Sequence, residues 1–165
     1  MMDAKIYVDS MCRRMAAQKV LAEKTIAQLS DEQLLWQPGA GSNSIFILMK
    51  HIAGNMVSRF TDFLDTDGEK TWRNRDEEFS SKDFQGRQQL LEVWDRAWQC
   101  FFNTLHDLED KDFSRTVFVK QEAHTAIDAI NRQVVHYADH VGQIVYIGKM
   151  LQKEQWQSLS IPRKV

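Results

Sequence analysis

Hydrophobic residues recur every three or four positions in four long stretches of the chain, with polar residues between them. The stretches cover residues 8–29, 45–63, 91–108 and 127–151. This spacing places the hydrophobic side chains on one face of an α-helix. Four amphipathic helices bury these faces best as a four-helix bundle, so the pattern predicts an all-α fold. Two prolines and seven glycines in 165 residues also favour long helices over strands.

Short polar motifs mark where the predicted helices begin. Ser30-Asp31-Glu32-Gln33 has the form of a capping box and predicts a short helical turn after the first long helix. Asn43 or Ser44 is the predicted N-cap of the second helix. The last helix is predicted to open at Thr125, within the capping pattern Thr125-Ala126-Ile127-Asp128.

Two connections between the helices are not short. Residues 65–87, between the second and third helices, form a polar segment longer than a bundle needs, and such loops are often functional or loosely ordered. Residues 115–121 alternate in side-chain type and include several β-branched residues. This pattern is compatible with a short extended segment before the last helix. A lone strand in a helical bundle needs a partner, for example another loop.

Composition limits the class of protein without naming a function. A chain of 165 residues with 43% hydrophobic residues is long enough for a single domain covering residues 1–165. A net charge of −2 does not suggest a nucleic-acid groove or a basic membrane-binding patch. The isolated residues Cys12 and Cys100 fit a reducing cytoplasm, and the sequence does not start with the apolar run of a signal peptide.

The most informative chemical feature is a pair of histidines, His136 and His140, on the last predicted helix. Residues four positions apart lie on the same face of a helix, so both imidazoles could bind one metal ion. A third ligand is required for a site that keeps an open position, and His51 on the second helix is the candidate. No pair of cysteines has the spacing of a thiolate site, so nitrogen ligands are expected.

Polar residues accompany these histidines on both helices. On the second helix they are His51, Asn55, Ser58 and Asp62, and on the last helix Gln133, His136, His140 and Gln143. A solvent-exposed face is one interpretation. Such a face is normally rich in Lys and Glu, however, whereas His, Asn and Gln suit a half-buried cavity with directed hydrogen bonds. We therefore expect Asn55 and Gln143 beside the metal ligands, or in contact with a substrate.

Together these features resemble the DinB/YfiT-like superfamily, and specifically a small branch of uncharacterised bacterial proteins. The resemblance covers nearly the whole chain. It rests on the segment from His51 to Phe79, on Ala129-Ile130-Asn131-Arg132, on His136-Tyr137, on His140-Val141-Gly142-Gln143-Ile144 and on the tail from Trp156 to Arg163. It implies a bundle with up-down-down-up connections, a homodimer, and three histidines that bind nickel or zinc. The five tryptophans and nine phenylalanines also favour a dimer, because one small bundle cannot readily cover them.

The chain departs from the pattern of that branch in two places. Lys120-Gln121 stands before Glu122 where an Arg-Gly pair is expected, and Asp139 stands where an uncharged residue is usual. Asp139 could orient a ligand imidazole, because metal-bound histidines commonly donate their second ring N–H to a carboxylate.

The resemblance implies a metal-dependent enzyme whose substrate is a small molecule. Related activities are transferases that use low-molecular-weight thiols such as bacillithiol, together with isomerases and hydrolases. A hydrolase could use Asp139 or Glu122 as proton acceptor. The alternative is a non-catalytic, stress-associated protein with a structural metal. Arg73 and Arg75, in the long polar segment, could bind the carboxylate of an anionic substrate, or could simply pair with acidic neighbours in a solvated loop.

Overall fold

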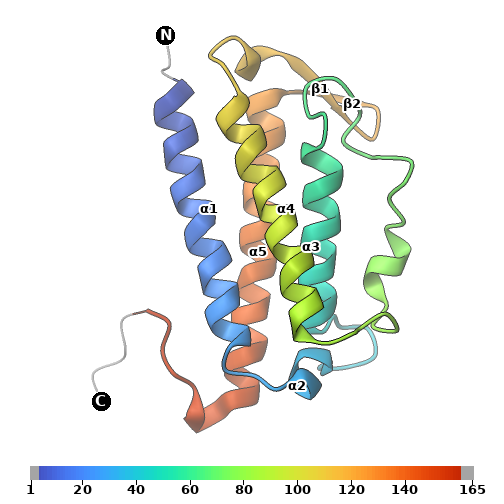
Figure 1. Ribbon diagram of the computed structural model, residues 1–165, viewed down its shortest axis with the longest axis vertical. Helices are drawn as coiled ribbons and strands as arrows, with labels where there is room; N and C mark the ends of the chain where they lie inside the picture. Colours follow the sequence, from blue (N-terminus) through green and yellow to red (C-terminus); the bar gives the residue numbers. More distant parts are fainter. Residues whose placement is uncertain (1–3, 161–165) are drawn as a thin grey trace.

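The computed structural model describes residues 4–160, so residues 161–163 of the tail motif lie outside the described part. Four long helices form the bundle: α1 (Ala4–Ile26), α3 (Ile45–Phe60), α4 (Arg87–Asp107) and α5 (Ala126–Gln152). α1 and α5 run in one direction and α3 and α4 in the other, and each of these parallel pairs packs side by side (Figure 1). The up-down-down-up bundle predicted from the sequence is therefore confirmed.

The predicted helix starts are present with their capping hydrogen bonds. Ser30 and Gln33 form a capping box at the short helix α2 (Asp31–Leu35). Ser44 caps α3 through the backbone N–H of Ile47, and Thr125 caps α5 through that of Asp128.

Two helices end earlier than their hydrophobic patterns suggested. Leu29 and Phe63 lie beyond the ends of α1 and α3, yet both side chains remain buried. Asp62, expected on the polar face of the second helix, also lies beyond the end of α3 and has a positive φ of 48°. Burial continues past the last helical turn, so the hydrophobic pattern overestimates helix length.

The long connection (residues 61–86) has a topological reason for its length. Because α3 and α4 are parallel neighbours, the chain must return along the whole bundle before α4 can start, and Figure 1 shows this segment on the outer side of α3. The sixteen residues of α3 span roughly 24 Å, which no short turn can bridge. One 3₁₀ turn, η1 (Asp76–Phe79), lies within this connection.

The extended segment before the last helix pairs with the residues that follow it. β1 (Thr116–Val119) and β2 (Glu122–Thr125) form an antiparallel hairpin in which Val119 pairs with Glu122. The two turn residues, Lys120 and Gln121, both have positive φ, which a two-residue hairpin turn of type I′ requires. The carboxylate of Asp67 accepts hydrogen bonds from both of their backbone N–H groups, at 2.9 and 2.7 Å. The long connection therefore stabilises a turn in which glycine would normally be favoured.

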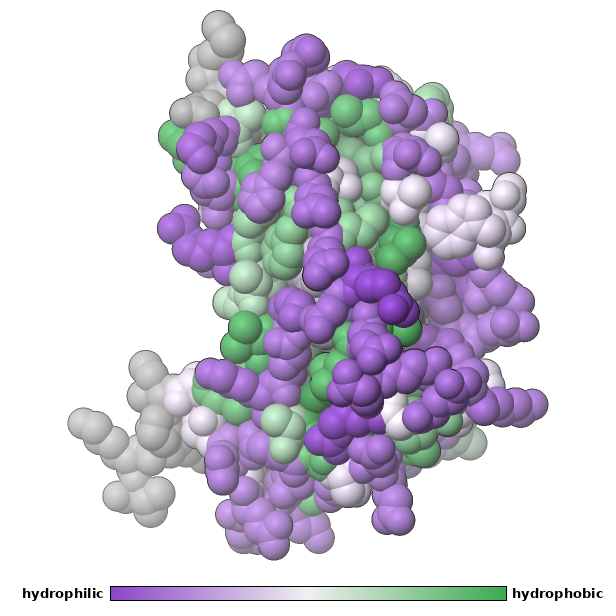
Figure 2. Space-filling model, in the orientation of Figure 1, coloured by the Kyte–Doolittle hydropathy of each residue, from purple (hydrophilic) through white to green (hydrophobic). Residues whose placement is uncertain are grey.

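The inward faces of the four helices form one continuous core. Its largest fully buried side chains include Trp94, Trp98, Tyr137, Phe60 and Phe101. Figure 2 shows hydrophilic residues over most of one face, with hydrophobic residues visible between them. Among the described residues, no helix is both long and apolar enough to cross a membrane.

Candidate metal centre

The three predicted ligands meet between α3 and α5. His51, His136 and His140 each present a ring nitrogen, and these nitrogens all lie within 4.8 Å of one another. The Nε2 atoms of His51 and His136 are 3.2 Å apart. His51 is 5% exposed, whereas the other two are half-buried. The two helices thus bring together residues that are 85 positions apart in the sequence.

A buried carboxylate from the long connection holds the first of these histidines. Nδ1 of His51 lies 2.8 Å from Oε2 of Glu78. An ionised carboxylate only accepts hydrogen bonds, so Nδ1 carries the proton and the lone pair of Nε2 points toward the other histidines. Burial by itself raises the pKa of Glu78, but hydrogen bonds from His51 and Arg73 and the positive charge of Arg73 bring that pKa below its usual value. Glu78 is therefore an anion that fixes the orientation and tautomer of His51.

Arg73 completes this arrangement behind Glu78. Its Nε donates to Oε1 of Glu78 at 2.7 Å and its Nη2 to Oε2 at 2.8 Å, which is a two-point contact. The side chains of Arg73 and Glu78 are only 3% and 7% exposed. Bidentate contacts of this kind fix both position and angle. Glu78 therefore cannot rotate freely away from His51.

Local features of α3 and η1 make room for Glu78 and hold it in place. A Cβ on Gly54, three residues after His51, would lie 2.3 Å from Oε1 of Glu78, so only glycine leaves space for the carboxylate. Lys50 donates hydrogen bonds to the backbone carbonyls of Glu77 and Ser80, which anchors the turn that carries Glu78. The ring of Phe79 covers that of His51, with centroids 5.0 Å apart.

The two histidines of α5 are held in their neutral, metal-binding form. Burial is the largest cause that lowers the pKa of His136 to about 4, and the neighbouring His140 and His51 and the charges of Arg73 and Arg59 lower it further. Burial also lowers the pKa of His140. The hydrogen bond with Gln143 raises this pKa, but by less than burial lowers it. Neutral imidazoles at these two positions offer lone pairs to a metal ion without adding positive charge.

The polar residues expected near the ligands have different roles. Gln143 lies with Oε1 3.3 Å from Nδ1 of His140, the outer nitrogen of that ring. Asn55 accepts a hydrogen bond from the hydroxyl of Tyr137 at 3.0 Å, which links α3 to α5 next to His136 in the sequence. Ser58 binds the long connection instead, by donating to the carbonyl of Gly68 at 2.7 Å.

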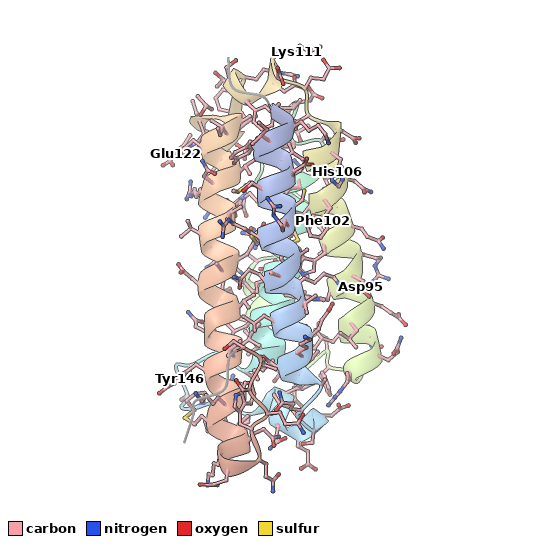
Figure 3. All side chains as sticks on the ribbon, turned by 90° about the vertical axis from the view of Figure 1, so that its left-hand side faces the viewer. Asp95, Phe102, His106, Lys111, Glu122 and Tyr146 are labelled. Atoms are coloured by element: carbon pink, nitrogen blue, oxygen red, sulfur yellow. The ribbon has the colours of Figure 1, made fainter. Side chains whose placement is uncertain are left out.

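Neither carboxylate suggested by the sequence as a site residue holds a histidine of the cluster. In the part of the chain that the structure describes, Asp139 makes no hydrogen bond to an imidazole, and it lines an open groove beside Gln143. Glu122 lies on the hairpin at one end of the bundle (Figure 3), where His124 is 3.9 Å away. His136 is ten residues into α5, so about 15 Å of helix separates it from that end.

The structure separates the two arginines proposed to hold a substrate. Arg73 is buried against Glu78, whereas the guanidinium of the exposed residue Arg75 lies 4.9 Å from the centre of the Phe79 ring. Glu78 itself was not anticipated. It stands in the run Asp76-Glu77-Glu78. Neither its spacing nor its neighbours in the sequence distinguish it from Asp76 and Glu77, which are exposed.

The comparisons with known proteins agree with this architecture. Residues 3–165 match the family described as "Protein of unknown function (DUF1572)". The chain belongs to the DUF1572 family. Its fold is similar to the crystal structure of a DinB-like protein, YjoA, from Bacillus subtilis, with a TM-score of 0.68 and 12% sequence identity. The match covers 92% of this chain and 96% of that one. No curated protein matches the chain.

The fold resemblance read from the sequence is thus confirmed for this DUF1572 member. The chain has a DinB-like helical fold. Its three-histidine group is compatible with metal binding.

The lowered pKa of His136 predicts how acid affects the metal-free protein. The unfolded chain takes up a proton at this residue near pH 6.5, whereas the folded chain does so only near pH 4. The free energy of unfolding should therefore fall as the pH decreases through this interval. Urea unfolding at a series of pH values measures the slope, which should be smaller in His136→Gln. An equal slope in both proteins would contradict the assignment.

Proposed function

We propose that this protein is a metal-dependent enzyme that binds nickel or zinc through Nε2 of His51, His136 and His140. The observation that carries the proposal is the geometry around His51, where Glu78 holds Nδ1 at 2.8 Å and leaves Nε2 facing the other two rings. Metal-bound histidines typically have such a partner on their second nitrogen. When bound, the metal supplies a positive charge that lowers the pKa of a coordinated water or thiol toward neutrality.

The residues present fit such an ion. Two nitrogens bound to one tetrahedral metal at about 2.0–2.1 Å lie about 3.3 Å apart. The 3.2 Å between Nε2 of His51 and Nε2 of His136 matches that separation closely. Neutral imidazole suits both nickel and zinc.

The ligand count favours catalysis over a structural metal. Structural zinc sites usually have four protein ligands, whereas catalytic sites have three and leave a position for substrate or water. Among the described residues, the group contains three histidines and no cysteine or carboxylate. Glu78 does not serve as a fourth ligand, because both of its oxygens already contact His51 or Arg73. The half-buried His136 and His140 leave the group accessible from the α5 side.

The chain provides a groove for a small substrate near the histidines, on the outer side of α5. An open groove of about 520 Å³ lies next to α5, between that helix and the segment that precedes α3. Gln143 lines this groove and also contacts Nδ1 of His140, so one side chain lies between the groove and the histidine cluster. Asp139 lines it too, and its exposed carboxylate can accept a proton from a substrate that lies there. These residues support S-transfer from a small thiol or hydrolysis of a small substrate.

The test compares metal-loaded protein with its controls in two reactions. Protein stripped with a chelator and reloaded with nickel or zinc is assayed for conjugation of bacillithiol or 2-mercaptoethanol to an activated aryl halide, and for hydrolysis of activated esters. We expect metal-dependent turnover in one of them. His106→Gln is a matched control, because His106 is exposed on α4 (Figure 3) and is not one of the clustered histidines. Stoichiometric metal without turnover above that of free metal would favour the structural alternative.

A further inference from the structure

Two buried arginines converge on one carboxylate next to the metal centre. Nη2 of Arg59 donates to Oε2 of Glu69 at 2.9 Å, and Nη1 of Arg73 lies 3.9 Å from the same oxygen. The side chains of Arg59 and Arg73 are 8% and 3% exposed, whereas that of Glu69 is 28% exposed. The two cations are thus buried in the protein, and the anion between them is partly exposed.

Arg59 has more hydrogen-bonding capacity than Glu69 uses. Its Nε and Nη1 are buried and have no hydrogen-bond partner in the described part of the chain. Buried donors without a partner are unfavourable, especially on a charged group, so most proteins avoid them. The free Nε lies on the same edge of the guanidinium as Nη2, which is the edge that a carboxylate contacts with two parallel hydrogen bonds. Glu69 contacts one nitrogen of that edge only.

We propose that Arg59 and Arg73 form a binding site for the carboxylate of an organic acid, and that Glu69 occupies this site when the acid is absent. The role of the acid as a substrate rests on the proposed function, whereas the binding site itself does not. A free carboxylate is not tethered to residue 69, so it can contact both Nε and Nη2 of Arg59.

The charges at the site select a singly charged group. Arg73 is already paired with Glu78, and Arg59 is paired with Glu69. When Glu69 leaves, Arg59 loses its ion pair, and the nearby charges of Asp67 and Lys70, which are opposite in sign, remain. A carboxylate neutralises the charge of Arg59, whereas a doubly charged phosphate would leave a buried excess of negative charge, which is unfavourable.

Exchange requires only that the side chain of Glu69 rotate outward. The backbone around it is fixed: its own N–H donates to Asp67 at 2.7 Å, and the next N–H, of Lys70, donates to Ser58 at 3.2 Å. Gly68 N–H donates to the carbonyl of Phe118 in the hairpin at 2.8 Å. The frame of the site therefore stays in place while the partly exposed carboxylate moves into solvent.

The site is linked to the histidines by direct contacts and by the helix that it shares with them. Arg59 is eight residues after His51 and four after Asn55, so all three are on one face of α3. Arg73 contacts Glu78, which contacts His51.

The experiment uses acetate and metal-free protein, so it is independent of any metal or turnover. Acetate affinity is measured from the side-chain N–H signals of the arginines in ¹H–¹⁵N NMR spectra. We expect Glu69→Gln to bind acetate about tenfold more tightly than the wild type, because the internal competitor has lost its charge. Glu77→Gln is the matched control, since it removes one exposed acidic charge from the same connection and should leave the affinity unchanged.

Two variants of Arg59 complete the test. Arg59→Lys keeps the charge but lacks the two-nitrogen edge, and Arg59→Met lacks both, so each should bind acetate at least tenfold more weakly than the wild type. If acetate affects Glu69→Gln and Glu77→Gln equally, or binds Arg59→Met as well as the wild type, the inference is wrong. Because the acetate experiment contains no metal, its failure would not contradict the proposed function. Absence of turnover in the metal-loaded protein would likewise not contradict the acetate site.

Discussion

Replacing any one of His51, His136 and His140 with Ala should abolish stoichiometric binding of nickel or zinc while the helical circular dichroism remains. A structural zinc site in a small peptide contributes about 10–16 kcal/mol, so one ligand of four accounts for roughly 3 kcal/mol or more. That loss corresponds to a decrease in affinity of more than about 100-fold. Elemental analysis of protein purified without chelator, followed by calorimetric titration, measures the effect.

The matched control for this series is His106→Ala, because His106 is exposed on α4 and takes no part in the cluster. It should bind a full equivalent of metal. If one of the three cluster variants also keeps a full equivalent at unchanged affinity, then that histidine is not a ligand.

The second large effect should come from a residue that does not touch the metal. Glu78→Gln weakens the acceptor for Nδ1 of His51 and the charge that faces Arg73, so metal affinity should fall by about 10- to 100-fold. Gly54→Ala should have a similar effect with every polar side chain intact, because its new Cβ would lie 2.3 Å from the present position of Oε1 of Glu78.

Glu77→Gln separates this effect from a simple loss of negative charge. Glu77 precedes Glu78 in the same turn but its side chain is exposed, so its variant should bind metal like the wild type. Thermal unfolding of the metal-free variants must accompany the titration, since breaking a buried ion pair by removing one charge costs about 3–5 kcal/mol. Wild-type metal affinity in a folded Glu78→Gln protein would show that Glu78 does not support His51.

Sequence periodicity was sufficient to predict the long helices and the helix faces on which the three histidines lie, because both depend on local residue spacing. The i,i+4 spacing of His136 and His140 determines that both side chains share a face of α5, wherever α5 lies in the fold. The hydrophobic face of α3 determines the side of that helix that is turned inward, whereas the position of His51 opposite α5 depends on the arrangement of the four helices, which the family resemblance implied.

The partners of the histidines depend on the path of the long connection, which no periodic pattern encodes. Glu78 reaches His51 because parallel α3 and α4 force the chain back along the bundle, and because Gly54 leaves a gap at that height. Arg73 follows the same path and is therefore buried against Glu78, whereas Arg75 turns to Phe79. The sequence alone could not distinguish these two arginines, since both stand in the same polar segment.

The separation of the ligands along the chain also affects how the protein folds. His51 and His136 are 85 residues apart, and Glu78 comes from a third segment, so no fragment of the unfolded chain can assemble the site. An ion that binds the finished site alone stabilises the native state by mass action, by about 2.7 kcal/mol at a free concentration 100 times its dissociation constant. The supply of metal in the cell would then influence the steady-state abundance of the protein through its resistance to proteolysis, quite apart from any reaction at the site.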